Sequence, residues 1–154
     1  ELSGLSLFGS RAIDSMRLEK GFLHWKADIL TEYDPIESDL ERFVKLDKAD
    51  FVGKHALLER RESAQARRRV TLQVDCATMP APAGASLMVQ DKVVGTVTSG
   101  EWGHRTGLNL AYAFVDKALA IEGTYLTADL CGNAVDVQVI PHSPYDPTFS
   151  RVRA

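Results

Sequence analysis

The sequence predicts an α+β protein, in which a helix-containing first part precedes a small antiparallel β-barrel or sandwich. Three observations support this prediction. Apolar residues recur at helical spacing over residues 8–20. From residue 70 onward, apolar and polar residues alternate as they do in strands. Short turns join the successive strand-like runs, which favours hairpins in a closed or layered sheet. We therefore expect two parts, residues 1–66 and residues 67–154.

The composition is that of an ordinary globular protein. The chain has 154 residues, of which 45% are hydrophobic and 25% charged, with a net charge of −3. This balance argues against a nucleic-acid binder. Cys76 and Cys131 lie far apart and outside any CxxC, which favours a reducing compartment such as the cytoplasm and disfavours a zinc site. No apolar run approaches the roughly 20 residues that span a bilayer, so we expect no membrane partner.

The start of the chain is unusual for a complete protein. Residue 1 is Glu rather than Met, and apolar residues follow at once, without a polar lead-in. No signal peptide is visible. We expect that the chain was cut from a larger polypeptide.

The first helix is expected over residues 8–20. Ser10 is placed to cap its start, and Gly21 is a natural stop. Asp14 precedes Arg17 by three residues, a spacing that allows a weak side-chain pair on one helix face.

A long connection over residues 22–46 mixes aromatic and acidic residues. Its length is unusual for a plain connector, so it either wraps the core or lines a site. Glu32, Asp34 and Glu37 are candidate paired acids near a reacting nitrogen. The spacing alone favours the alternative, a solvated acidic loop.

A second helix is expected from Gly53 to Ala66, and the run Arg67–Arg69 follows it. The spacing favours a solvated helix end for these arginines, where cations suit the helix dipole. The alternative is that they join Arg17 in binding a carboxylate bidentately.

The second part shows strand patterns joined by turns and loops. The expected strands cover residues 70–74, 86–90, 93–99, 109–115, 125–130 and 135–140. Residues 100–107, which include Trp102 and His104, are expected to form a loop, as are residues 79–84. The tail after residue 140 is rich in proline.

Common catalytic motifs are absent from the sequence. There is no phosphate-binding P-loop, no GxSxG and no HExxH, and the glycines of residues 100–107 are spaced wrongly for a dinucleotide fingerprint. The four histidines are scattered singly, which is more typical of surface or core residues than of ligands. The residues alone thus indicate an α+β protein that can bind an anion.

Four segments resemble the glycine-cleavage T-protein (aminomethyltransferase) family, and they occur in the family's order. They are Arg11–Gly21 beside "ARDxLRLEAG", Tyr33–Leu40 beside "TPxExGL", Phe43–Leu57 beside "KxDFxGKxAL", and Val94–Gly100 beside "GxVTSG". Lys20 and the Glu41–Val44 segment are most similar to the carboxy-terminal folate region of dimethylglycine and sarcosine dehydrogenases.

The resemblance implies a folate-binding one-carbon enzyme. Residues 1–66 would end a folate-binding subdomain, and residues 67–154 would form the family's carboxy-terminal β domain. In the family, tetrahydrofolate sits between three subdomains and captures a one-carbon unit leaving an amine. A helix-end arginine meets the glutamate tail of the folate. Arg17 matches this arginine, and Arg11 is the alternative.

Three further folate contacts follow from the resemblance, namely Tyr33, Arg42 and Arg69. Arg42 stands where T-proteins often have an aromatic residue, so its contact would differ from theirs. The match of Arg69 slips easily to Arg68. No catalytic residue and no metal ligand is assigned.

The family's glycine-rich amino-terminal half is missing from this chain. A flavin domain with FAD is possible only before residue 1. The isolated chain is therefore expected to be inactive, and its parent protein to use folate and a small methylated amine, as a possible homo-oligomer. In a eukaryote, the resemblance places the protein in the mitochondrial matrix.

Two other functions compete with the enzyme hypothesis. A related branch binds folate without methyl transfer and serves iron–sulfur maintenance, but its "KGCYxGQE" signature lacks a counterpart at residues 47–54. Alternatively, the β part is a structural module that docks subunits through Trp102 and the tail.

Overall fold

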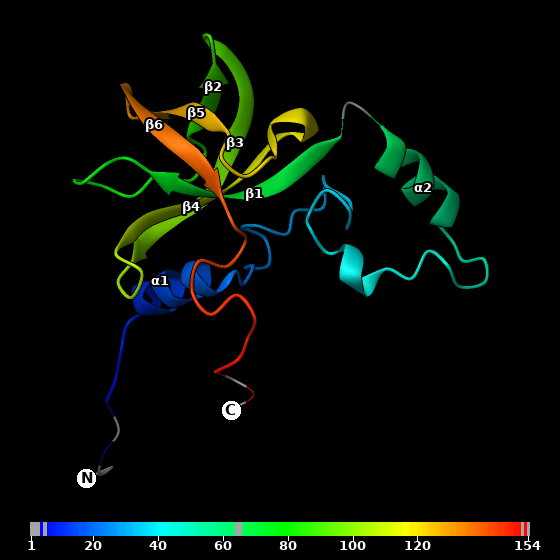
Figure 1. The fold of residues 1–154 in the computed structure, drawn as a ribbon, viewed down its shortest axis with the longest axis horizontal. Helices are drawn as coiled ribbons and strands as arrows, with labels where there is room; N and C mark the ends of the chain where they lie inside the picture. Colours follow the sequence, from blue (N-terminus) through cyan, green and yellow to red (C-terminus); the bar gives the residue numbers. More distant parts are fainter. Residues whose placement is uncertain (1–3, 5, 64–65, 152, 154) are drawn as a thin grey trace.

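The structure is a computed structural model that describes residues 4, 6–63, 66–151 and 153. It confirms an α+β fold, with helices concentrated in the first part and strands in the second (Figure 1). The elements in chain order are α1 (Ser10–Lys20), η1 (Glu41–Phe43), α2 (Lys54–Glu62), β1 (Arg67–Val74), β2 (Ser86–Val89), β3 (Lys92–Gly103), β4 (Leu108–Asp116), η2 (Lys117–Leu119), β5 (Tyr125–Leu130) and β6 (Asn133–Ile140).

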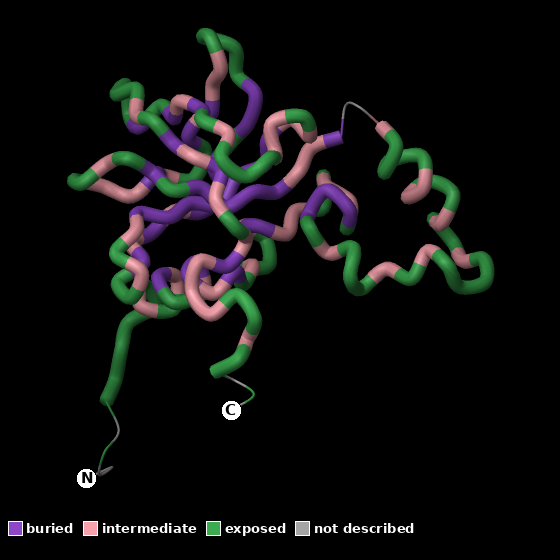
Figure 2. Tube along the Cα trace, in the orientation of Figure 1, coloured by how far each residue is buried: buried purple, intermediate pink, exposed green. Residues whose placement is uncertain are grey.

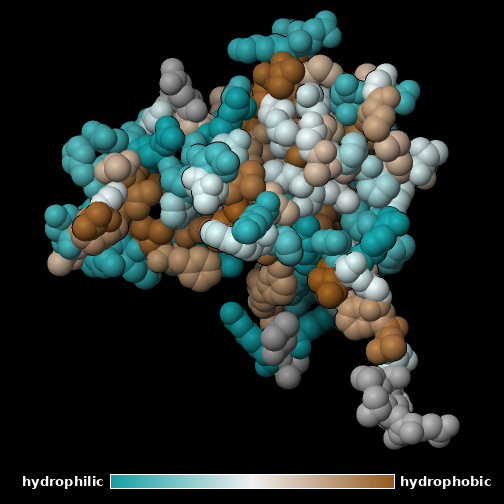
Figure 3. Space-filling view, turned by 180° about the vertical axis from the view of Figure 1, so that it is seen from behind, coloured by the Kyte–Doolittle hydropathy of each residue, from teal (hydrophilic) through white to brown (hydrophobic). Residues whose placement is uncertain are grey.

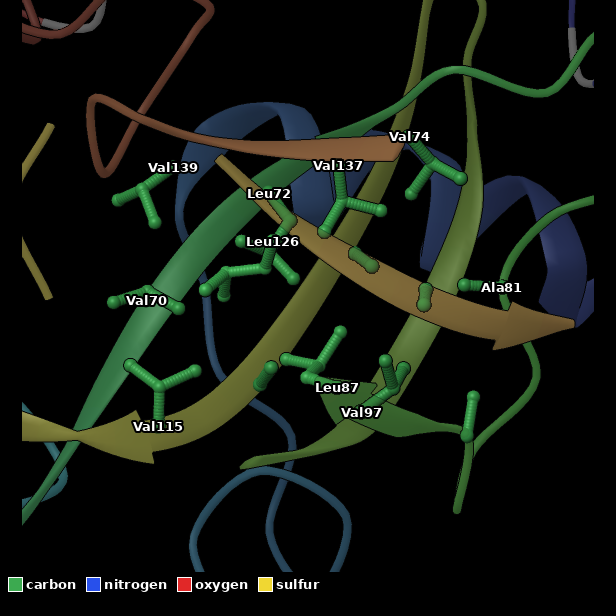
Figure 4. Packing of buried hydrophobic residues seen from close by; sticks show 14 of the residues in the cluster. Val70, Leu72, Val74, Ala81, Leu87, Val97, Val115, Leu126, Val137 and Val139 are labelled. Atoms are coloured by element: carbon green, nitrogen blue, oxygen red, sulfur yellow. The ribbon is translucent and has the colours of Figure 1, made fainter. Parts of the chain in front are cut away.

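The six strands close into a barrel in the order β1-β4-β3-β2-β5-β6, and every neighbouring pair is antiparallel. This order confirms the expected hairpins and decides for a barrel over a sandwich. Closure pairs every strand on both sides, so no long edge is left open to aggregation. The barrel interior holds mainly valine, leucine and alanine from alternate positions of the strands, as the labelled side chains in Figure 4 show.

Strand β4 is buried on both of its faces. Ala111, Ala113 and Val115 point into the barrel, whereas Tyr112 and Phe114 lie on its outer face and are equally inaccessible to solvent. A strand of a lone small barrel would expose this outer face. The first part of the chain covers it here, and α1 packs across β3 and β4. The site described below lies in this outer layer.

Helix α1 begins and ends at glycines. Its N-cap is Gly9, which makes no side-chain cap, so the prediction that Ser10 caps the helix was wrong; Ser10 is its first helical residue. The predicted stop at Gly21 is confirmed. Gly21 has φ +77°, and the amide of Phe22 donates to the carbonyl of Arg17 at 2.8 Å, which gives a Schellman-type end.

The arginine run was misassigned to a helix end. Helix α2 ends at Glu62, four residues before the predicted end, and residues 64–65 lie outside the described residues. Arg67–Arg69 begin β1 instead. Arg69 points to the outer face of the barrel, where the second layer buries it. The same run of charged residues in a sequence can thus belong to a solvated helix end or to a strand with a buried position.

Strand β3 is longer than predicted. It continues through Gly103, across residues that were expected to form a loop, and Trp102 therefore lies in a strand. A Cβ built on Gly100 would lie 2.2 Å from the carbonyl oxygen of Ala81. The glycine that weakens the strand pattern is needed because another backbone passes close by.

Residues 41–62 form an arm that extends away from the barrel (Figures 1 and 2). None of its residues is buried. Val52 is fully exposed and Phe43 is 69% exposed, and hydrophobic residues are visible along the arm in the view from behind (Figure 3). Among the described residues, no helix has the length and apolar content needed to span a bilayer.

Candidate functional site

A fully buried carboxylate, Asp28, joins the first part of the chain to the barrel. Its Oδ1 accepts hydrogen bonds from the hydroxyls of Thr98 and Ser99, each at 2.7 Å. Its Oδ2 accepts from Arg17 Nη1 at 2.6 Å and from the amide of His24 at 3.0 Å. These four bonds satisfy the charge that burial would otherwise make costly.

A β-bulge in β3 makes the two hydroxyls available together. The register with β4 shifts between Val97 and Ser99. Side chains of consecutive strand residues normally point to opposite faces. The bulge turns Thr98 and Ser99 toward the same outer face, where both reach Asp28.

Arg17 lies at the centre of this network. Its Nε donates to Asp14 at 2.7 Å, which confirms the predicted pair along α1, and its Nη2 donates to Ser99 at 3.0 Å. With Nη1 on Asp28, all three nitrogens have internal acceptors, and only 11% of the side chain is exposed. The guanidinium therefore fastens α1 to the barrel.

Three of the five predicted folate contacts meet over the outer face of β4. The guanidinium carbons of Arg17 and Arg69 lie 5.8 and 5.0 Å from the ring centroid of Tyr112. Tyr33 stacks on Phe114, with ring centroids 3.7 Å apart and planes 13° apart. Burial raises the pKa of the Tyr112 hydroxyl well above its ordinary value, although the two arginines oppose this rise.

Arg69 is almost inaccessible, with 1% of its side chain exposed. Its Nη2 donates to Asp39 at 2.8 Å and contacts Nδ1 of His142. Nε and Nη1 of Arg69 have no hydrogen-bond partner. The cation–π contact with the ring of Tyr112 is therefore the main interaction that offsets the cost of burying this part of the guanidinium. Burial and the nearby Arg69 charge lower the pKa of His142, and Asp39 only partly offsets them. Because a guanidinium can only donate, Nδ1 accepts and the imidazole is neutral.

The remaining two predicted contacts lie apart from this layer. Arg11 extends from α1 to Glu101, with Nε to Oε2 at 3.0 Å, and its side chain is 80% exposed. Arg42 is exposed at the start of the arm and lies over the ring of Phe43, 4.8 Å from its centroid.

An apolar groove of about 380 Å³ runs along the C-terminal half of α1. Ile13, Met16 and Phe22 provide apolar walls, and Tyr145 of the tail provides an aromatic one. Its other lining residues are Arg17, Glu19, Lys20 and Arg105. This combination suits a flat apolar ligand that carries negative charge at one end.

The tail closes one side of the groove and is held in place by α1. Lys20 Nζ donates to Oδ2 of Asp146 at 2.6 Å and lies 4.0 Å from the ring centroid of Phe149. The Lys20 hydrogen bond lowers the pKa of Asp146 to about 2. The carbonyl of Glu19 accepts from the amide of Tyr145 at 2.9 Å.

Two of the three acidic candidates of the connection, Asp34 and Glu37, accept hydrogen bonds from backbone amides. Glu37 is buried, and its two oxygens accept from the amides of Arg67 and Asp34 at 2.9 and 3.2 Å. Oδ1 of Asp34 accepts from two amides of the turn that follows it. The prediction of a solvated acidic loop was therefore wrong for Glu37. Of the three candidate acids, only Glu32 is exposed. The described residues contain no cluster of three or more acidic, histidine or cysteine side chains that could hold a metal ion.

Several residues of the site were missed from the sequence. Asp28, Ser99 and Tyr112 belong to the central network, and Arg105 and Tyr145 belong to the groove. The only sequence signal for Asp28 was its place in an unusually long connection. The partners of these residues lie many tens of positions away in the chain, as with Tyr145 and Glu19, so local patterns do not reveal them.

Comparisons with known proteins agree with this architecture. Residues 67–146 match the family model of the glycine cleavage T-protein C-terminal barrel domain, and residues 1–48 match that of the GCVT N-terminal domain. The chain is 35% identical over 138 residues to the mitochondrial dimethylglycine dehydrogenase of Mus musculus, and 36% identical over 138 residues to an aminomethyltransferase of Saccharopolyspora erythraea. Each alignment covers 89% of the chain.

A solved structure is also similar. The crystal structure of the glycine cleavage system aminomethyltransferase T from Bartonella henselae superposes with a TM-score of 0.78 at 32% identity, over 88% of this chain and 38% of that one. The chain spans 16% of the length of the mouse dehydrogenase and 38% of the Saccharopolyspora aminomethyltransferase.

Proposed function

Because the chain belongs to the glycine cleavage T-protein family, we propose that it forms the carboxy-terminal part of a tetrahydrofolate-dependent one-carbon enzyme. The parent protein is an aminomethyltransferase or a dehydrogenase of the dimethylglycine or sarcosine type. In it, folate accepts a one-carbon unit from an aminomethyl or methylated amine.

The groove beside α1 is the observation that supports this function most directly. Its walls are apolar and aromatic, and its rim carries Lys20 and Arg105. Tetrahydrofolate combines a flat ring system with a carboxylate tail, so the residues present suit it. When bound, folate supplies the nitrogen that accepts the one-carbon unit. The role of this chain is to bind and orient that ligand.

The five predicted contacts differ in what they offer to folate. Arg17 lines the groove and stays a proposed contact there, together with its structural role. Arg11 and Arg42 have exposed side chains available for contacts. Tyr33 and Arg69 pack over β4, and we propose that they support the site from behind.

The proposed compartment, partners and cofactor of the protein follow from the same proposal. We place it in the cytoplasm, or in the mitochondrial matrix of a eukaryote, without nucleic-acid or membrane partners. FAD belongs to the parent protein only if that protein is a dehydrogenase. The division into residues 1–66 and 67–154 also stays a prediction, since α1 packs directly on the barrel.

Calorimetric titration with tetrahydrofolate tests the proposal. We expect the full-length protein that contains this chain to bind folate, and the isolated chain to bind it weakly and without turnover. Micromolar binding by the isolated chain would overturn the view that it holds only part of the site. Absence of binding by the full-length protein would overturn the folate function itself.

A non-catalytic role within the same family is the alternative. The unburied arm of residues 41–62 favours it, because exposed apolar side chains such as Phe43 and Val52 suit a protein contact. Size-exclusion measurements on Trp102→Ala test the predicted interface of the β part, and an unchanged oligomer would count against it.

A further inference from the structure

The tail beyond His142 forms a strap, residues 143–151, along one side of the groove, and its Tyr145 provides the aromatic wall. At the base of the strap, the hydroxyl of Thr71 donates to the carbonyl of His142 at 3.0 Å, and the imidazole contacts Arg69. Both of these partners belong to β1. The base of the strap is therefore fixed to the barrel.

The strap itself has few ties to the rest of the molecule. Among the described residues outside the tail, its hydrogen bonds, ion pairs and ring contacts reach only the end of α1, Phe22 and Arg105. Ser143 is its only buried residue. Because local stability follows burial and contact density, the strap can separate from the groove without unfolding of the barrel.

One ion pair fastens the strap to α1. Lys20 Nζ donates to Oδ2 and to the backbone carbonyl of Asp146, at 2.6 and 2.7 Å. Only 11% of the Lys20 side chain and 4% of the Asp146 side chain are exposed. The other oxygen of Asp146 accepts from the amide and the hydroxyl of Ser150, each at 2.9 Å. The same carboxylate therefore orders the turn within the strap and ties that turn to the helix.

The backbone of the strap is strained beside this ion pair. Asp146 has φ +48° and Phe149 has φ +55°, which is the left-handed region that residues other than glycine rarely adopt. Such conformations persist where surrounding contacts impose them, and they cluster in clamps and switch regions. Here the contacts are Lys20 Nζ, 4.0 Å from the ring centroid of Phe149, and the ring of Phe22, 6.1 Å from it. Release of the strap relieves this strain.

We infer that the strap opens and closes over the groove, with His142 as its fixed base and the ion pair of Lys20 and Asp146 as its latch. A ligand enters or leaves the groove only while the latch is open. The nature of that ligand rests on the proposed function, whereas the movement of the strap does not. A weaker latch should therefore speed both the association and the dissociation of the ligand.

Hydrogen exchange of the full-length protein, followed by mass spectrometry on peptides of the strap, measures the opening without any ligand. We expect the strap to exchange faster than β4. Asp146→Asn and Lys20→Met should each speed the exchange of the strap by about tenfold or more, since one partner of a buried ion pair is lost, and leave β4 unchanged. Glu122→Gln is the matched control, because Glu122 is an exposed acid that does not line the groove, and it should change neither rate.

Stopped-flow binding of tetrahydrofolate to the same proteins tests the control of access. We expect Asp146→Asn to raise the association and dissociation rate constants by about the factor found for exchange, so that Kd changes less than either rate constant. Glu122→Gln should leave both rate constants unchanged.

The outcomes separate this inference from the proposed function. A strap that exchanges as slowly as β4, or that Asp146→Asn does not affect, is a fixed wall, and the inference is then wrong. Faster exchange with unchanged binding rates would also overturn it, because the strap would not control access to the groove. If the unaltered protein does not bind tetrahydrofolate, the proposed function fails, and the exchange results alone decide whether the strap opens.

Discussion

At the scale of single residues, Arg17 forms ion pairs with two carboxylates, Asp28 and Asp14, which allow a direct comparison between a buried and an exposed ion pair. Asp28 is fully buried, whereas 46% of the Asp14 side chain is exposed. Removing one partner of a buried ion pair leaves the other charge buried without a counter-charge, which lowers the free energy of unfolding by about 3–5 kcal/mol. An exposed pair along a helix is worth less than about 1 kcal/mol. We therefore expect Asp28→Asn to reduce the free energy of unfolding by several times more than Asp14→Asn.

Urea unfolding of both variants, followed by circular dichroism, measures the difference. Each substitution removes one negative charge from the same guanidinium, so the change in net charge cancels in the comparison. Equal losses for the two variants would mean that Arg17 does not depend on Asp28 as the network indicates.

His142 makes the stability of the protein depend on pH. Burial, followed by the charge of Arg69, lowers its pKa below the ordinary value of 6.5. The unfolded chain therefore binds the proton more readily than the folded chain. The stabilisation is complete above about pH 6.5, and it is lost as the pH falls toward the lowered pKa of the folded state. The charges that face the imidazole are Arg69 of β1, and Asp39 and Arg42 of the first part.

The measurement is thermal unfolding of the protein and of His142→Gln between pH 7 and pH 5. Glutamine can accept from Arg69 but has no proton to gain in this range. We expect the unaltered protein to lose more stability on acidification than the variant. Parallel pH profiles would contradict this role of His142.

At the scale of elements, the end of α1 is fixed by a glycine with two independent constraints. Gly21 has φ +77°, and a Cβ built on it would lie 2.6 Å from Nε2 of His142. Gly123 has φ +88°, but nothing lies within 4 Å of its Cβ position. Gly123→Ala therefore incurs only the backbone strain, about 1 kcal/mol. Gly21→Ala adds a steric conflict with the tail.

Chemical denaturation of the two alanine variants separates these effects. We expect Gly21→Ala to be clearly more destabilising than Gly123→Ala. Equal losses would indicate that the tail moves aside freely and that His142 does not hold the end of α1.

The elements also show what the sequence can predict. The strands were found because valines and leucines alternate along them toward one barrel interior. The end of β3 was missed because Gly100 serves a close backbone approach that only the fold creates. The family resemblance proposed Arg17 as a folate contact, which stays a prediction, but it did not reveal the partner Asp28, whose site depends on a bulge 70 residues away in the chain. Arg69 was wrongly predicted to lie at a solvated helix end. It lies on a strand face that a second layer buries, and a local charge pattern does not reveal that layer.

At the scale of the whole molecule, the barrel and the arm differ in what holds them together. The barrel strands are paired on both sides around a continuous apolar core. The arm of residues 41–62 has no buried residue, and its ties to the rest include the ion pair from Arg60 to Asp34 at 3.4 Å and the bond from Lys117 Nζ to the carbonyl of Arg61 at 2.7 Å. Local stability follows burial and contact density. The arm should therefore open without the barrel.

Amide hydrogen exchange tests this separation. We expect the amides of α2 to exchange by local opening, well before those of β4, whose exchange should require unfolding of the barrel. Val52→Asp should change the unfolding free energy by less than about 0.5 kcal/mol, because the side chain is already in water. Val97→Asp, at a buried barrel position, should prevent stable folding because it buries an unpaired charge. Protection of α2 equal to that of β4 would show that the arm packs more firmly than its burial indicates.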